Sequence, residues 1–255
     1  MLPIQPVLQP IVDLAGHEVL GYEMLSRGPA EMESPAALFE YARQSGSTWK
    51  LERACRLAAL RAIAALPDAT RTGHMFFLNV NADAFEDPRF VAGFTLAALV
   101  EYGIRQSQVV IEITERVSIA DYGRFEEAIK HYARQGFRIA LDDFGSGHSG
   151  LVTLLSCRPH YLKLDMAITR GIHADGYKQM IVKSVVALAE NIGAELIAEG
   201  VETWEELQSL MAYGVRYAQG YLLGKPSAEA TRLPEDILRQ LKARAREERQ
   251  ERHAS

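Results

Sequence analysis

Polar side chains recur at one kind of place in this sequence: the end of a short apolar run that is typical of a β-strand. Most are carboxylates or amides, and one is a lysine. If the strands are parallel and close into a barrel, these side chains gather at one mouth, where such folds keep their chemistry. A mouth of this composition favours a divalent metal and an anionic ligand. The residues are Glu23, Asn79, Glu112, Asp142, Asp143, Lys163, Asp165, Glu199, Glu202 and Gln219.

The carboxylates need a cation because like charges that converge on one mouth repel each other, and burial raises that cost. Mg²⁺ and Mn²⁺ prefer an all-oxygen ligand set. The neighbours Asp142 and Asp143 could bridge two such ions, an arrangement suited to in-line phosphoryl chemistry. Any one acid has a structural explanation, such as a turn cap for Asp142, but folding does not require the whole series.

Two basic residues accompany the acids. Lys163 either balances their charge, holds a metal-bound water, or neutralises charge that builds on a phosphate. Arg27 lies four residues after Glu23, and this spacing fits a phosphate contact as well as a surface arginine.

The segment 143–150, DFGSGHSG, predicts a flexible loop whose amides can face an anion. It lacks the Gly-Lys-Ser/Thr of a Walker loop, and its Asp-Phe-Gly triplet lacks the other kinase motifs. We interpret His148 as a loop residue, with a general acid or base as the alternative. No Gly-x-Ser-x-Gly motif occurs, so nothing indicates a serine nucleophile.

The elements that must position these residues alternate between strand and helix. Ala15-Gly16 splits two strand-like runs and predicts an antiparallel hairpin. The predicted fold is α/β, a modified TIM (β/α)₈ barrel with one antiparallel strand. An open doubly wound sheet is the alternative, but it would not explain a polar group at every strand end. The predicted strands are 4–14, 17–25, 74–81, 108–113, 137–142, 160–164, 194–198 and 215–219, and the main helices are 35–46, 48–66, 88–102, 121–136, 175–192 and 203–214.

Composition limits the classes of partner. The net charge of the 255 residues is −5 and no basic block precedes the C-terminus, so polymeric nucleic acid is not expected. No signal peptide and no apolar run of the roughly 20 residues that span a membrane is found, so we expect a cytoplasmic protein without a membrane partner. Cys55 and Cys157 have no metal-ligand spacing and are interpreted as reduced thiols.

The chain is expected to divide into a domain at 1–232 and a charged helix or tail at 233–255. After Pro234, a weak apolar stripe of Ile237, Leu238, Leu241 and Ala245 gives way to RAREERQER, which has no apolar face.

In their order along the chain, these segments closely resemble the EAL-domain family of cyclic di-GMP phosphodiesterases over residues 3–230. The signature triplet stands here as Glu23-Met24-Leu25, with methionine in the place of alanine, and the loop has Gly147-His148-Ser149-Gly150 where the family usually has Gly-Tyr-Ser-Ser. The resemblance rests on QPIVDLAGHEVLGYEMLSR, NVNADAFEDPRF, VVIEITE, LDDFGSGHSGL, YLKLD, AEGVET and QGYLLGKP.

The resemblance implies hydrolysis of one bond of cyclic di-GMP to linear pGpG with two Mg²⁺ or Mn²⁺ ions. A non-catalytic cyclic di-GMP receptor is the alternative; such members usually lose metal ligands, and this chain keeps them. Another barrel enzyme, acting on sugar phosphates with a metal, is argued against by the ordered motifs.

The resemblance also implies a role for each site residue. The first ion would bind Glu23, Asn79, Glu112 and Asp142. The second would share Asp142 and bind Asp143, helped by Glu202 directly or through water. Lys163, Glu199 and Asp142 would form the catalytic group, with Lys163 at the attacking water. Arg27, Leu25 and Gln219 would contact substrate. Glu115 would anchor the loop after Asp143, a region tied in the family to dimer formation, so a homodimer is expected.

Overall fold

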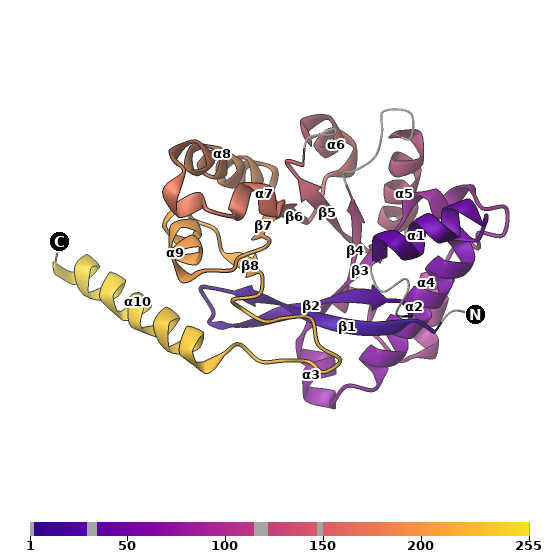
Figure 1. Cartoon of the computed structure of the whole chain (residues 1–255), viewed down its shortest axis with the longest axis horizontal. Coiled ribbons are helices and arrows are strands. Elements are labelled where there is room, and N and C mark those ends of the chain that lie inside the picture. Colours follow the sequence, from indigo (N-terminus) through magenta and orange to yellow (C-terminus); the bar gives the residue numbers. More distant parts are fainter. Residues whose placement is uncertain (1–2, 30–34, 115–121, 147–149, 255) are drawn as a thin grey trace.

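The computed structural model describes residues 3–29, 35–114, 122–146 and 150–254. Eight strands close into a barrel in their sequence order, with helices around it (Figure 1). The predicted (β/α)₈-type barrel is confirmed, and the open sheet is wrong. The strands are β1 (Gln5–Asp13), β2 (Glu18–Arg27), β3 (Met75–Val80), β4 (Val109–Thr114), β5 (Arg138–Phe144), β6 (Tyr161–Leu164), β7 (Glu195–Ala198) and β8 (Tyr217–Gln219).

One strand runs against the others, as the hairpin signal predicts. β1 pairs antiparallel with β2, where Gln9 lies opposite Glu23, and antiparallel with β8, where Ile11 lies opposite Gln219. Every other neighbouring pair in the barrel is parallel. Because β1 is reversed, its first residue, Gln5, lies beside Arg27 at the end of β2.

The helices cover the outside of the barrel (Figure 1). A capping box begins the helix that starts at Trp204: Thr203 Oγ1 accepts the N–H of Glu206, and the Glu206 carboxylate accepts the N–H of Thr203. The helices are α1 (Pro35–Gln44), α2 (Thr48–Ala64), α3 (Asp68–Gly73), α4 (Phe94–Glu101), α5 (Tyr122–Arg134), α6 (Gly150–Cys157), α7 (Met166–Thr169), α8 (Gly176–Ile192), α9 (Trp204–Ala212) and α10 (Glu235–Ala254), with short 3₁₀ turns η2 (Ala82–Glu86), η3 (Gln106–Gln108) and η5 (Ile172–Ala174).

One helix begins later than its sequence pattern predicts. The prediction starts it at Pro88, but α4 begins only at Phe94. Asp87 accepts hydrogen bonds from the backbone and side chain of Arg89, and Arg89 also donates to the carbonyl of Gly46. These contacts hold the chain in a turn where a helix would have started.

Two layers fill the interior of the barrel because side chains two residues apart on a strand point the same way. The lower layer is apolar and includes Phe77, Val110 and Ala140. Two residues further along the same strands stand Asn79, Glu112 and Asp142. The polar layer therefore lies next to the apolar layer, on the side of the barrel formed by the carboxyl ends of the parallel strands. A larger apolar core lies between the strands and the surrounding helices.

The C-terminal helix α10 runs away from the barrel (Figure 1). Its first turns are nevertheless attached, since Ile237 and Leu241 are buried in the outer core. The domain boundary at 232 stays a prediction. Among the described residues, no helix combines the length and apolar character needed to cross a membrane.

Candidate metal centre

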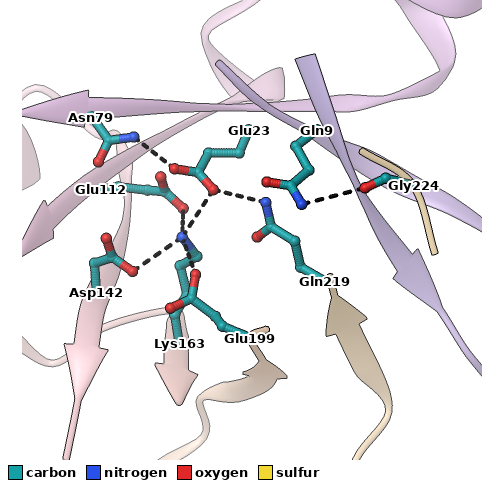
Figure 2. A network of polar contacts seen from close by, with 9 residues as sticks. All are labelled: Gln9, Glu23, Asn79, Glu112, Asp142, Lys163, Glu199, Gln219 and Gly224. Carbon is teal, nitrogen blue, oxygen red and sulfur yellow. Dashed lines mark hydrogen bonds and ion pairs between the residues drawn. The ribbon is translucent and has the colours of Figure 1, made fainter. Parts of the chain in front are cut away.

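Lys163 stands at the centre of the polar layer, and four carboxylates from four other strands or strand ends surround it (Figure 2). Its Nζ lies 2.8 Å from Glu199 Oε1, 2.9 Å from Glu112 Oε1, 3.1 Å from Asp142 Oδ1 and 3.4 Å from Glu23 Oε2. Lys163 and Glu112 are fully buried. The predicted convergence of strand-end acids therefore exists, with the lysine among them.

Glu23 is held on both sides by amides. Asn79 Nδ2 donates to Glu23 Oε1 at 2.9 Å, and Gln219 Nε2 donates to Glu23 Oε2 at 2.8 Å. In the same layer, Gln9 Nε2 donates to the carbonyl of Gly224 at 3.3 Å (Figure 2). Gln9 was not singled out from the sequence, although its pairing with Glu23 across the hairpin would have indicated it.

Charge and burial shift the pKa values of the side chains in this layer in different directions. Burial raises the pKa of Glu112, and the charges of Glu23 and Asp142 add to the rise. Burial also raises the pKa of Glu199. For Glu23 burial acts in the same direction, but Lys163 and the two amides outweigh it, and its pKa is lowered. Burial alone would lower the pKa of Lys163, yet the surrounding carboxylates raise it well above its usual value, so the ammonium is retained.

The donor atoms fit a hard divalent cation. Glu112 Oε2 is buried and has no hydrogen-bond partner among the described residues, which is costly for a carboxylate unless a cation binds it. Single oxygens of Asp142, Asp143 and Glu199 all lie within 4.8 Å of one another. Carboxylate and amide oxygens of this kind suit Mg²⁺ or Mn²⁺ better than softer metals.

Asp143 has a left-handed backbone, with a φ of 57°. Consecutive residues of a regular strand point to opposite faces, so Asp142 and Asp143 could not both serve one site from an ideal strand. The left-handed residue breaks this alternation, and the β5–β6 register shifts between Leu141 and Phe144. Strained backbone of this kind persists where the surroundings hold it, often at functional sites.

Two of the strand-end acids have other partners. Glu202 forms an ion pair with Arg170 and is not in the Asp142, Asp143 and Glu199 group. Asp165 caps α7 by accepting the N–H of Ala167 at 2.7 Å, which is a structural role. Glu115 lies outside the described residues, as do Gly147, His148 and Ser149 of the loop after Asp143.

A cavity of about 680 Å³ lies where β1 and β2 meet the segment after β8, and its lining begins four residues beyond Glu23 on β2 and two residues beyond Gln219. Arg27 lines it, and Leu25, at the end of the same strand, is partly buried. Tyr221 and Lys225 also line it, with the Lys225 ammonium 5.5 Å from the Tyr221 ring centre. These two residues were missed as site residues because their closeness to Arg27 depends on the barrel closing through the reversed β1.

The family model that matches this chain is described as the EAL domain, and it covers residues 4–226. The chain belongs to the EAL domain family. Its match to the probable cyclic di-GMP phosphodiesterase PdeG of Escherichia coli is 30% identical and covers 88% of this chain and 44% of PdeG. A cyclic di-GMP phosphodiesterase of Pseudomonas aeruginosa is also 30% identical, over 91% of this chain and 39% of that protein. This EAL chain thus spans less than half the length of these curated relatives.

Solved EAL structures share the fold. BlrP1 of Klebsiella pneumoniae, in a manganese and cyclic di-GMP complex, matches with a TM-score of 0.81 and 33% identity over 91% of this chain and 58% of that one. A standalone EAL protein from Vibrio cholerae, bound to cyclic di-GMP, matches with a TM-score of 0.79 and 30% identity, covering 92% of this chain and 98% of that one.

Proposed function

We propose that this EAL domain hydrolyses one phosphodiester bond of cyclic di-GMP and releases linear pGpG, using Mg²⁺ or Mn²⁺. The observation that carries the proposal is the buried Glu112 carboxylate, which keeps one oxygen without a partner in a layer of converging acids. The names of EAL relatives, and complexes of related structures with cyclic di-GMP, support the same reaction.

Glu23, Asn79, Glu112 and Asp142 are the proposed ligands of one ion, and Asp143 with Glu202 those of a second that shares Asp142. Glu202 would have to exchange its Arg170 partner for this role. Ions bound here would lower the pKa of a coordinated water and neutralise negative charge on the phosphate. A pair of ions is proposed because Asp142 and Asp143 both face the site.

Lys163 is proposed to orient the attacking water and to offset charge on the phosphate. Because its ammonium is retained, it acts as a hydrogen-bond donor, and proton acceptance falls to the carboxylates. Glu199 lies 2.8 Å from Lys163 Nζ and Asp142 lies 3.1 Å away, so both can share the water with it. The apolar layer beneath keeps other water out.

The adjacent cavity is proposed to hold the rest of the dinucleotide. Arg27 offers a fork of donors to a phosphate. The Tyr221 side chain is 56% exposed and presents a ring on which a base can stack. Leu25 would contact the base, and Gln219 would keep Glu23 oriented.

The deciding experiment incubates the purified chain with cyclic di-GMP and Mn²⁺ and separates the nucleotides by chromatography. The proposal expects pGpG, and expects Glu23→Ala and Asp142→Ala to abolish it while Glu101→Gln, at an exposed acid on α4, leaves it unchanged. Binding of cyclic di-GMP without any pGpG would favour the receptor function.

We also propose that the domain forms a homodimer through the face that carries α6. Leu151 and Leu155 on this helix are 65% and 79% exposed, and the helix directly follows the segment after Asp143. Glu115 is the proposed anchor of that segment. Light scattering should give twice the chain mass, and Leu155→Glu should reduce it to one; a monomeric wild type would contradict the dimer.

A cytoplasmic location is proposed on the basis of the two cysteines. Cys55 and Cys157 are both free and buried, which suits a reducing compartment. Fractionation of cells that produce the protein should recover it with cytoplasmic markers; recovery with the envelope would contradict this.

A further inference from the structure

A buried ion pair that the proposed function does not use lies outside the barrel, where α2 packs on α4 and α5. Glu52 and Arg56 stand one turn apart on α2, and Glu52 Oε1 is 2.5 Å from Arg56 Nη2. Both side chains are 2% exposed. Arg56 Nη1 also donates to Thr95 Oγ1 at 2.7 Å and to the Tyr132 hydroxyl at 2.5 Å.

Stability alone is a weak reason for such a pair. Desolvating two charges costs so much that apolar residues of similar volume often replace a buried pair without loss. The contacts of the pair with its neighbours therefore indicate what else it does.

One of these contacts leads toward the metal centre. Glu52 Oε1 accepts the backbone N–H of Asn81 at 3.2 Å. Asn81 is the first residue after β3, and its own side chain accepts the N–H of Asp83 at 2.8 Å, opening the turn η2. The end of β3 is thus held by α2 on one side and by its own cap on the other.

Asn79 lies two residues before this anchor. It donates to Glu23 at 2.9 Å, and it is level with Glu112 in the pairing of β3 with β4. Asn79 is solvent-exposed, so it lacks the packing that would otherwise fix its position. Any shift of the strand end would move Asn79 relative to both carboxylates.

We propose that Glu52 is a positioning residue for the metal centre: it holds the end of β3 through the N–H of Asn81, and so sets the place of Asn79 beside Glu23. The proposal rests on the proposed function for its purpose, since Asn79 is a ligand only if the centre binds metal. It assigns Arg56 the task of holding the Glu52 carboxylate pointed at the strand.

The test separates this role from general stability. Glu52→Leu combined with Arg56→Met removes the contact to Asn81 and replaces the pair by apolar groups. Tyr132→Phe is the matched control, because it takes a partner from Arg56 in the same buried network and leaves the Glu52–Asn81 contact intact. Two readouts are needed: hydrogen exchange of the Asn81 amide in metal-free protein, and Mn²⁺ affinity by calorimetry without nucleotide.

The double variant should exchange the Asn81 amide about tenfold faster. It should bind Mn²⁺ about tenfold more weakly, the low end for residues that orient metal ligands. Tyr132→Phe should stay within about twofold of wild type in both readouts. An unchanged Asn81 amide, unchanged Mn²⁺ affinity, or an equal loss in Tyr132→Phe would each overturn the proposal.

If the double variant does not fold, Glu52→Asp takes its place under the same criteria. It keeps the charge for Arg56 but is one methylene too short to reach both Arg56 and Asn81. Failure of the proposed function would look different: the wild type would release no pGpG, while the comparison of Mn²⁺ affinities would still decide the role of Glu52.

Discussion

Lys163 Nζ lies 2.9 Å from Glu112 Oε1, in a place that solvent does not reach. Three further carboxylates share this one ammonium. Without a bound cation the layer is rich in negative charge at a depth where charge is poorly solvated, so its stability and its metal binding are coupled.

Glu112→Gln should separate the stability of the protein from its metal binding. The substitution removes a buried carboxylate whose pKa burial has raised, so the metal-free protein should be at least as stable as wild type, with a gain of about 1 kcal/mol. The increase in Tm that Mn²⁺ produces in wild type should be lost. Thermal unfolding in EDTA and in Mn²⁺ measures both, with Glu101→Gln as control, and a metal-free variant much less stable than wild type would contradict the expectation.

Lys163→Met should have the opposite effect on stability. Removing the ammonium leaves four carboxylates without their shared partner, and the metal-free protein should lose about 3 kcal/mol in the free energy of unfolding. Mn²⁺ should raise the Tm of this variant by more than it raises the Tm of wild type. Turnover should fall at least about 100-fold even at saturating metal, and near-normal turnover would exclude a role for Lys163 at the reacting water.

Arg27→Ala and Tyr221→Ala should act mainly on substrate binding. Both residues line the cavity between β1, β2 and the segment after β8, and neither is among the proposed metal ligands. The KM for cyclic di-GMP should rise about tenfold for each, as expected for one charged or stacking contact, with a smaller change in kcat. Tyr177→Ala, at an exposed tyrosine on α8, is the control for Tyr221.

Ca²⁺ should bind the centre and inhibit turnover. It accepts the same oxygen ligands but prefers longer bonds and a looser geometry than Mg²⁺ or Mn²⁺. Titration of Ca²⁺ into an assay that contains Mn²⁺ should lower the rate of pGpG release. Equal turnover with Ca²⁺ as the only metal would contradict the two-ion model.

The contact between Asp13 and Arg216 should make the stability of the protein depend on pH. Arg216 Nη2 lies 2.8 Å from Asp13 Oδ2, and Asp13 also accepts the amides of Ala15 and Gly16. Burial alone would raise the pKa of Asp13, but these hydrogen bonds outweigh it and lower the pKa. The stabilisation is therefore present above the usual carboxyl pKa of about 3.9 and is lost as the pH falls through the lower folded value.

Asp13→Asn should cost about 1 kcal/mol at neutral pH, since the Arg216 side chain is half exposed. The difference from wild type should stay constant above about pH 5 and shrink below about pH 4. Urea unfolding across this range measures it, and a difference that grows toward low pH would show the sign to be wrong.

The sequence alone predicts the barrel and most of the polar layer because strand periodicity ties them together. Phe77 and Asn79 are two residues apart on one strand, as are Val110 and Glu112 on the next. Side chains at this spacing point to the same face, so when the apolar residue is buried inside the barrel, the polar residue also points inward, at the mouth. The hairpin signal at Ala15-Gly16 likewise determines the direction of β1.

Other features depend on contacts between distant segments and could not be predicted. The left-handed backbone of Asp143 has no local marker such as glycine. Arg170 is 32 residues from its partner Glu202, and nothing in the spacing indicates the pair. Lys225 and Tyr221 meet Arg27 only after β8 has closed against β1.

The reversal of β1 also decides from which side this domain can be approached. In a regular (β/α)₈ barrel the first strand starts at the base, opposite the catalytic mouth. Here Gln5 starts beside Arg27, at the rim of the cavity. A regulatory module joined ahead of β1 would therefore lie next to the entrance of this cavity. From there it could admit or block a nucleotide directly, and no conformational change would have to be transmitted across the barrel.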